Sequence, residues 1–186
     1  MTGTEHMSDK VIHLNDARLE RHTKRAFRNW ESRFGESFGP GTTIEQISDK
    51  TLAFLAEGRN KSSFYLLDLI MNVIGMGSAF DFNELPPKEQ IAVMDRHLFL
   101  LDLIRYEYMK RLGWLESYPG EESTLVELVV DFERLAPGLR ADTPTLSPNH
   151  PAYEAFCAAS TLEKEELIRK LIPKALEMIQ DSSTTL

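Results

Sequence analysis

Polar side chains interrupt two of the most apolar segments of this 186-residue chain, at spacings that could bring them together. Asp68 and Asn72 lie four residues apart, which places both on one face if their segment is helical. Asp102 and Arg105 lie three residues apart in a second apolar segment, with His97 nearby. A carboxylate inside an apolar interior must be paired, so we expect Arg105 to form an ion pair with Asp68 or Asp102.

These five residues support two interpretations. They could line a ligand-binding or catalytic pocket between two helices, where a few polar groups converge in an apolar surround. They could also face water as polar stripes, or form an ion pair that fixes how the helices align. Burial alone does not make a functional site, so the second interpretation is favoured, and the sequence assigns no catalytic residue.

Signatures of metal and cofactor binding are missing from the sequence. Helical metal sites use pairs such as His-x-x-x-His or Glu-x-x-His, which bring two ligands onto one face, and neither pair occurs around the five histidines. The glycines at Gly75 and Gly77 are not followed by the Gly-Lys-Ser/Thr of a phosphate-binding loop. We therefore expect neither a metal nor a cofactor.

A second candidate surface lies near the N-terminus, where a basic segment precedes an acidic remainder. Residues 18–33 carry six Lys or Arg and two Glu, although the whole chain has a net charge of −8. At helical spacing this segment is basic and amphipathic, which suits an acidic patch of the chain's own domain or of a partner, nucleic acid or an anionic surface. Docking onto the chain's own acidic part is favoured, because it requires no partner. The residues expected to bind a partner are Arg18, Arg21, Arg25, Arg28 and Trp30.

The elements that must position these side chains are helices. Over residues 86–112 a long helix is predicted, because Pro86 and Pro87 suit its first turn and Gly113 suits its end. Two apolar stripes on this helix require neighbours on two sides. The stripes are Ile91, Met94, Leu98 and Leu101, and Val93, Leu100, Ile104 and Tyr108. With no alternating run to indicate a strand, the sequence predicts an all-α bundle of six to seven helices around this central long helix.

The length of the chain suits one domain. We expect a disordered leader over residues 1–14, a single all-α domain over residues 15–181 and a frayed tail over residues 182–186. Within the domain, a basic first helix is expected over residues 15–34 and an irregular proline-rich connection over residues 136–149. Capping boxes that begin further helices are Thr42 with Glu45, Thr124 with Glu127, and Ser160 with Glu163.

Cysteine usage and hydropathy indicate the compartment. The single cysteine, Cys157, excludes an intramolecular disulfide and favours a reducing environment, and we expect its side chain to be buried. No stretch of about 18 apolar residues indicates a membrane span. The first residues lack the apolar core of a signal peptide, so a cytoplasmic protein is expected.

Two short pieces of the chain resemble the helix-turn-helix of TetR-type repressors. They run from Thr43 to Ser48 and from Ala56 to Tyr65. Together with the basic N-terminus, this resemblance implies a DNA-binding regulator with a ligand pocket in its acidic part. The pieces are farther apart than that family's compact turn, and core-like residues follow Tyr65 where a recognition helix should end, so the chain is not assigned to the family.

These observations favour a non-enzymatic α-helical protein that acts by binding another macromolecule. The expected partner is a protein or a second copy of the chain in a homodimer, and nucleic acid is an alternative partner of the basic first helix. Two other functions stay open: a helix-turn-helix regulator with a ligand pocket, and an enzyme or small-molecule binder with a polar pocket between helices.

Overall fold

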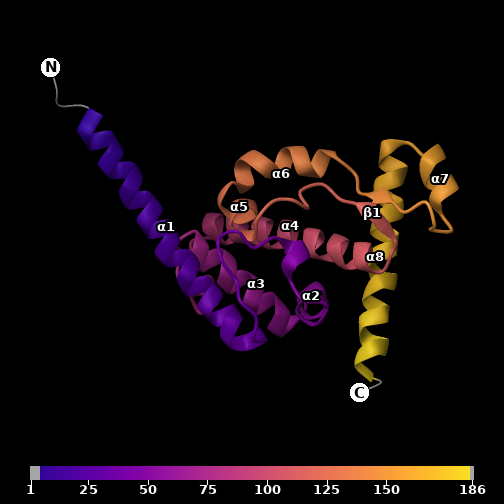
Figure 1. The fold of residues 1–186 in the computed structure, drawn as a ribbon, viewed down its shortest axis with the longest axis horizontal. Coiled ribbons are helices and arrows are strands. Elements are labelled where there is room, and N and C mark those ends of the chain that lie inside the picture. The colour runs from indigo at the N-terminus through magenta and orange to yellow at the C-terminus, as the bar shows by residue number, and fades with distance from the viewer. Residues whose placement is uncertain (1–4, 185–186) are drawn as a thin grey trace.

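Helices dominate the computed structural model, which describes the backbone of residues 5–184 and the side chains of residues 15–181 (Figure 1). The predicted all-α helical bundle is confirmed. In chain order the helices, 3-10 turns (η) and short strands are α1 (Glu5–Phe34), η1 (Ile44–Gln46), α2 (Asp49–Ala56), α3 (Asn60–Val73), η2 (Ala79–Glu84), α4 (Pro87–Arg111), β1 (Leu115–Ser117), α5 (Leu125–Val130), α6 (Phe132–Ala141), β2 (Thr145–Leu146), α7 (Tyr153–Ala158) and α8 (Thr161–Thr184).

Helix α4 is the central element, as the sequence predicts. It packs against α2, α3, α5 and α8, and α3 in turn packs against α1. The second predicted stripe faces the core through Val93, Leu100 and Ile104. The first stripe is only partly buried. Ile91 and Leu98 are 64% and 52% exposed, because the covering helices leave one side of α4 open to solvent.

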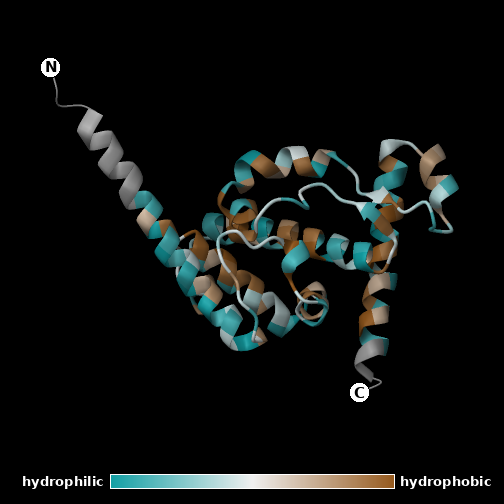
Figure 2. Cartoon of the chain, in the orientation of Figure 1, coloured by the Kyte–Doolittle hydropathy of each residue, from teal (hydrophilic) through white to brown (hydrophobic). Residues whose placement is uncertain are grey.

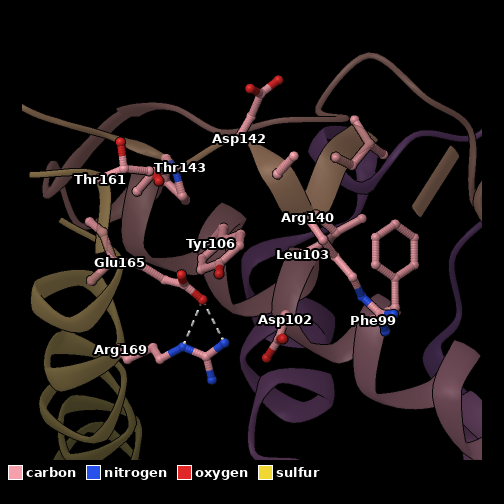
Figure 3. A pocket seen from close by; sticks show the side chains of 14 residues that line it. Phe99, Asp102, Leu103, Tyr106, Arg140, Asp142, Thr143, Thr161, Glu165 and Arg169 are labelled. Atoms are coloured by element: carbon pink, nitrogen blue, oxygen red, sulfur yellow. Dashed lines mark hydrogen bonds and ion pairs between the residues drawn. The ribbon is translucent and has the colours of Figure 1, made fainter. Parts of the chain in front are cut away.

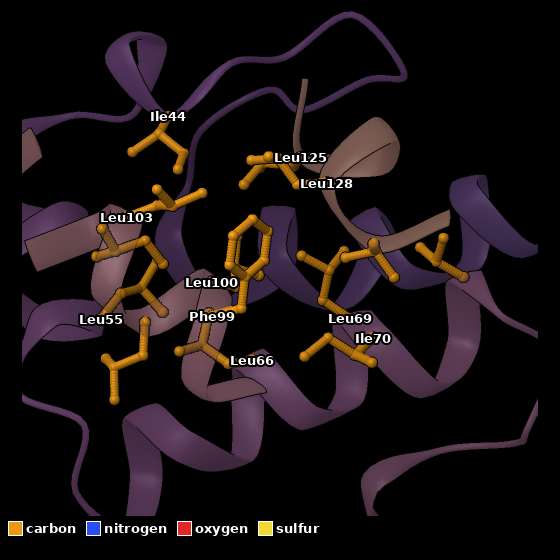
Figure 4. Close-up of a cluster of buried hydrophobic side chains, with 14 of the residues drawn as sticks. Ile44, Leu55, Leu66, Leu69, Ile70, Phe99, Leu100, Leu103, Leu125 and Leu128 are labelled. Atoms are coloured by element: carbon orange, nitrogen blue, oxygen red, sulfur yellow. The ribbon is translucent and has the colours of Figure 1, made fainter. Parts of the chain in front are cut away.

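The main core fills the space between α1, α2, α3, α4 and α5 (Figure 4). In Figure 2 the hydrophobic stretches of α3, α4 and α5 lie toward the middle of the molecule. Leu66, Leu69 and Ile70 line up on α3 at helical spacing and are fully buried. Trp30 joins α1 to this core, because its buried indole nitrogen donates a hydrogen bond to the carbonyl oxygen of Tyr65 at 3.0 Å.

A smaller second core lies at the C-terminal end of α4. Met109 of α4 packs there with Leu146 of β2, Phe156 of α7, and Ile168 and Leu171 of α8. The strands β1 and β2 pair antiparallel beside it. Helix α4 therefore belongs to both cores and joins them.

Element boundaries differ from the predictions in three places. Helix α1 begins at Glu5, ahead of the expected start at residue 15, and residues 1–4 of the expected leader lie outside the described residues. Helix α6 continues to Ala141 through the first part of the expected 136–149 connection, because Phe132 and Ala136 bury one face and Pro137 is exposed. Helix α8 continues to Thr184, and residues 185–186 of the expected tail lie outside the described residues.

The expected helix from Thr42 is instead a 3-10 turn followed by α2. Thr42 does not cap a helix. Its hydroxyl accepts a hydrogen bond from Gly39 N–H at 2.8 Å, and its carbonyl accepts one from Leu125 N–H at 2.9 Å. Ser48 then caps α2 through Thr51 N–H at 3.3 Å. The other two expected capping boxes are confirmed, at Thr124 with Glu127 and at Ser160 with Glu163.

The side chain of Cys157 is exposed, which corrects the expectation that it is buried. Helix α7 has only six residues and buries Phe156 alone, so the neighbouring cysteine faces solvent.

The packing of α4 predicts that truncating two of its leucines lowers the free energy of unfolding by different amounts. Leu101→Ala should lower the free energy of unfolding by about 2–5 kcal/mol, because Leu101 is 5% exposed and its loss leaves a cavity. Leu98→Ala is the matched control and should cost less than about 0.5 kcal/mol, because Leu98 is half exposed. Urea denaturation of both variants measures the difference, and equal losses would contradict this packing of α4.

Candidate functional site

The structure brings Asp68 and Asn72 together but separates them from the other predicted site residues. The Asp68 carboxylate accepts hydrogen bonds from Asn72 Nδ2 at 3.1 Å, from Asn29 Nδ2 at 2.7 Å and from Ala79 N–H at 3.1 Å. These donors come from α3, α1 and the start of η2. The buried carboxylate is thus satisfied by neutral donors, and it ties three elements together.

Arg105 does not form the expected ion pair. Its Nε donates to the carbonyl oxygen of Ala56 at 2.9 Å, and its Nη2 donates to that of Glu57 at 3.3 Å. These carbonyls end α2, where a cation is favoured by the helix dipole. Gly58 makes the approach possible, because it has φ of +63° and a Cβ there would lie 2.7 Å from Arg105 Nη2. Arg105 attracts Asp102 electrostatically.

His97 lies alone in the interior. Its ring is buried, and neither ring nitrogen has a hydrogen-bond partner within the described part of the chain. Burial lowers the pKa of His97, and the positive charge of Arg105 lowers this pKa further. The ring therefore stays neutral near pH 7 and packs as a core side chain. The five predicted residues do not converge on one pocket.

Asp102 instead lines a different hollow, which we name the α8 pocket (Figure 3). It has a volume of about 160 Å³ and lies between α4, the C-terminal end of α6 and the first turns of α8. Its ionisable and phenolic side chains are Asp102, Tyr106, Arg140, Asp142, Glu165 and Arg169. Asp102 is exposed at the mouth, yet the surrounding protein displaces enough water to raise its pKa.

The arginines of the α8 pocket are held in place by different contacts. The Arg140 guanidinium lies over the rings of Phe99 and Phe132, at 5.4 and 5.3 Å from their centroids. Arg169 donates from Nη2 and Nε to Glu165 on the same helix, at 2.8 and 3.3 Å. Both arginines attract the Asp102 carboxylate. Burial raises the pKa of Tyr106 to about 12, so its hydroxyl stays protonated.

The basic face that the sequence predicts is present on α1, with one correction. Arg18, Arg21, Arg25 and Arg28 are all exposed, on the side of α1 opposite its core residues, and we name them the basic ridge. Trp30 is wrong as a member of this face, because it is fully buried and bonds to Tyr65. An apolar residue on an amphipathic helix faces the core, and Trp30 follows that rule.

The ridge arginines form no ion pair with any side chain in residues 15–181. Arg25 attracts Asp81 of η2 electrostatically. Within the described residues, the ridge is therefore not docked through ion pairs onto the acidic part of the chain.

Sequence reasoning missed most of the α8 pocket and one buried charged network. Glu107 accepts from Arg111 Nε at 2.8 Å and from the Tyr118 hydroxyl at 2.9 Å, and Arg111 also pairs with Asp49 of α2 at 2.8 Å. The four-residue spacing of Glu107 and Arg111 was a usable signal. No comparable signal joins the end of α6 to α8, because those residues meet only through tertiary packing.

The described residues carry no trio of His, Cys, Asp or Glu placed to hold a metal ion. Nor does any helix within them combine the length and apolar character needed to cross a membrane. Comparisons with protein families, with curated proteins and with solved structures find no match for this chain. The basic ridge and the α8 pocket are the two candidate binding surfaces of the described residues.

The buried state of His97 predicts how stability depends on pH. An unfolded histidine has a pKa of about 6.5, and burial lowers that of folded His97. Below about pH 6.5 the unfolded chain therefore binds a proton that the folded chain resists, so stability falls as pH falls. His97→Leu should reduce this fall between about pH 7 and about pH 5, as measured by urea denaturation.

The matched control is Leu100→Met, which changes a neighbouring buried side chain without adding or removing a titratable group. It should keep the pH dependence of the wild type. Parallel pH profiles for wild type and His97→Leu would show that His97 is not the titrating group.

Proposed function

We propose that this protein is a non-enzymatic binding protein that recognises an acidic surface of a partner protein through the basic ridge. The observation that carries this proposal is the alignment of Arg18, Arg21, Arg25 and Arg28 on one exposed side of α1. The four residues span about 15 Å along the helix, which is long enough to meet several carboxylates at once. Guanidinium groups suit carboxylates, because they can donate two parallel hydrogen bonds.

The placement of α1 supports this proposal. Figure 1 shows that the N-terminal part of α1 stands away from the other helices, while its C-terminal part packs on α3. A partner can therefore reach the ridge without displacing the core. The helix is also rigidly seated, since Trp30 and Asn29 bond to Tyr65 and Asp68 of α3. A preformed face loses less conformational entropy on binding than a disordered segment does.

Charge favours an acidic protein surface over nucleic acid. The whole chain has a net charge of −8, so a long polyanion that extends past the ridge would meet repulsion. The solvent-exposed residues of α1 also include the acidic residues Asp16, Glu20 and Glu31. A compact acidic patch can be matched to four arginines, whereas a duplex presents a continuous row of phosphates.

The helix-turn-helix alternative is not favoured by the packing of α3. Helices α2 and α3 are indeed joined by only three residues, 57–59. A recognition helix, however, must expose its side chains to the major groove. Helix α3 lies between α1 and α4, and only Asn60 and Lys61 at its first turn are exposed. The enzyme alternative is not favoured either, because the five polar residues expected to line its pocket lie apart.

Charge removal on the ridge tests the proposal. The variant Arg18→Gln/Arg21→Gln/Arg25→Gln/Arg28→Gln should lose binding to a fluorescent poly-glutamate peptide, measured by fluorescence anisotropy at low ionic strength. The matched control removes the same charge from exposed lysines elsewhere, as Lys50→Gln/Lys61→Gln/Lys88→Gln/Lys174→Gln. It should bind the peptide as the wild type does, since the ridge is intact.

A DNA duplex of similar total charge is the competing probe. Ridge-dependent binding that is tighter to the duplex than to the peptide, with a steep salt dependence, would replace this proposal by the nucleic-acid alternative. Equal loss of peptide binding in both charge variants, or no binding to the peptide at all, would overturn it.

A further inference from the structure

We propose that the α8 pocket binds a small zwitterion of the α-amino acid class, with Asp102 receiving the ammonium group and Arg169 the carboxylate. This site is independent of the basic ridge, because it lies between α4, α6 and α8. Three features of the pocket favour such a ligand: its volume, the signs of its charges, and the hydrogen-bond partners that these charged groups lack.

Volume limits the ligand to a small molecule. The pocket holds about 160 Å³, below the roughly 300–1,000 Å³ of sites for drug-sized ligands. A nucleotide or a peptide would not be enclosed. A single amino acid or another compact metabolite suits this volume.

The balance of charge argues against a simple anion. Arg140 and Arg169 supply two positive charges, whereas Asp102, Asp142 and Glu165 supply three negative ones. A ligand that is only an anion would meet a net negative lining. A ligand that carries both signs can satisfy the two kinds of group at once.

Asp102 receives no hydrogen bond from the described part of the chain, so its carboxylate at the pocket mouth can accept one from a ligand. Within the described residues its carboxylate interacts with arginines only through electrostatic attraction, and burial disfavours its charge. In Figure 3 the side chains of Asp102 and Arg169 approach the same part of the pocket from α4 and α8. An ammonium group placed there would donate charge-assisted hydrogen bonds to this carboxylate.

Arg169 is placed to receive the carboxylate of the ligand. Its Nε and Nη2 are fixed by Glu165, and its Nη1 forms no hydrogen bond within the described residues. The pair with Glu165 orients the guanidinium without neutralising Asp102, which the arginine also attracts. A ligand carboxylate can therefore accept from Arg169 while the adjacent ammonium group lies at Asp102, and Arg140 adds a second positive charge nearby.

An apolar wall completes the site. Leu103, Ile168 and Pro144 line the pocket and are all buried. The Tyr106 hydroxyl stays protonated, so it can donate a hydrogen bond without adding negative charge. The lining thus offers contacts for an aliphatic side chain that extends away from the ligand's ammonium and carboxylate groups, and an aliphatic amino acid satisfies more of it than glycine would.

Thermal denaturation of the full chain in the presence of individual L-α-amino acids at millimolar concentration tests this proposal first. At least one aliphatic amino acid, with L-leucine as the lead probe, should raise Tm, because a ligand that binds only the folded state stabilises it. Titration calorimetry then gives the affinity. Asp102→Asn and Arg169→Gln should each weaken binding by about tenfold or more, since each removes a charge-assisted contact.

Matched controls lie on neighbouring surfaces. Asp95→Asn changes an exposed carboxylate on the same helix as Asp102, and Arg134→Gln changes an exposed arginine of α6; both lie outside the pocket. Both should bind L-leucine as the wild type does. Melting curves without ligand show whether each variant is folded, so a loss of binding is separated from a loss of structure.

Two analogues of L-leucine decide whether both charges are needed. 3-Methylbutylamine lacks the carboxylate, and 4-methylpentanoate lacks the amine, so each should bind at least about tenfold more weakly than L-leucine. Equal binding of the amine would make this a cation site, and equal binding of the acid would make it an anion site; either result overturns the proposal. It is also overturned if no amino acid raises Tm, or if the control variants lose binding as strongly as Asp102→Asn.

Discussion

The burial of α4 is the constraint on which the rest of the structure depends. A helix covered on most sides cannot leave its polar groups to water, so each must find a partner inside the protein or remain neutral. Arg105 meets this requirement by capping α2, and Glu107 meets it with Arg111 and Tyr118. His97 stays uncharged, although neither of its ring nitrogens has a hydrogen-bond partner within the described residues. The position of α2 and the loop around Tyr118 thus follow from what α4 carries into the interior.

The positions of the basic ridge and the α8 pocket follow from how the other helices cover α4. At one end of the molecule α1 is attached through α3, which leaves its basic side free. At the other end α8 crosses α4 and leaves a charged hollow between them (Figure 1). One surface suits a macromolecule and the other a small molecule. The two proposed sites therefore use different residues.

Hydrogen bonds between residues close in the sequence could be predicted from the sequence, whereas contacts between distant segments could not. The helix starts at Thr124 and Ser160 were predictable, because each capping box is completed within four residues. The start at Thr42 was not, since Leu125 N–H, far along the chain, bonds to its carbonyl. The five polar residues were correctly seen as unusual in apolar helices. Their separate partners depend on α1, α2 and α8, whose positions the spacing within one helix does not specify.

The sharing of α4 by two cores has a consequence for how the molecule opens. Ile168 and Leu171 of α8 belong to the smaller core, whereas Ile179 of the same helix packs into the main one. Helix α8 is therefore a strap across the junction, and α7 with the strand pair rests on the smaller core alone. Partial unfolding should begin there, so amide hydrogens of α7 and early α8 should exchange with solvent faster than those of α3. Anything held between α4 and α8 would keep this strap closed and slow that exchange.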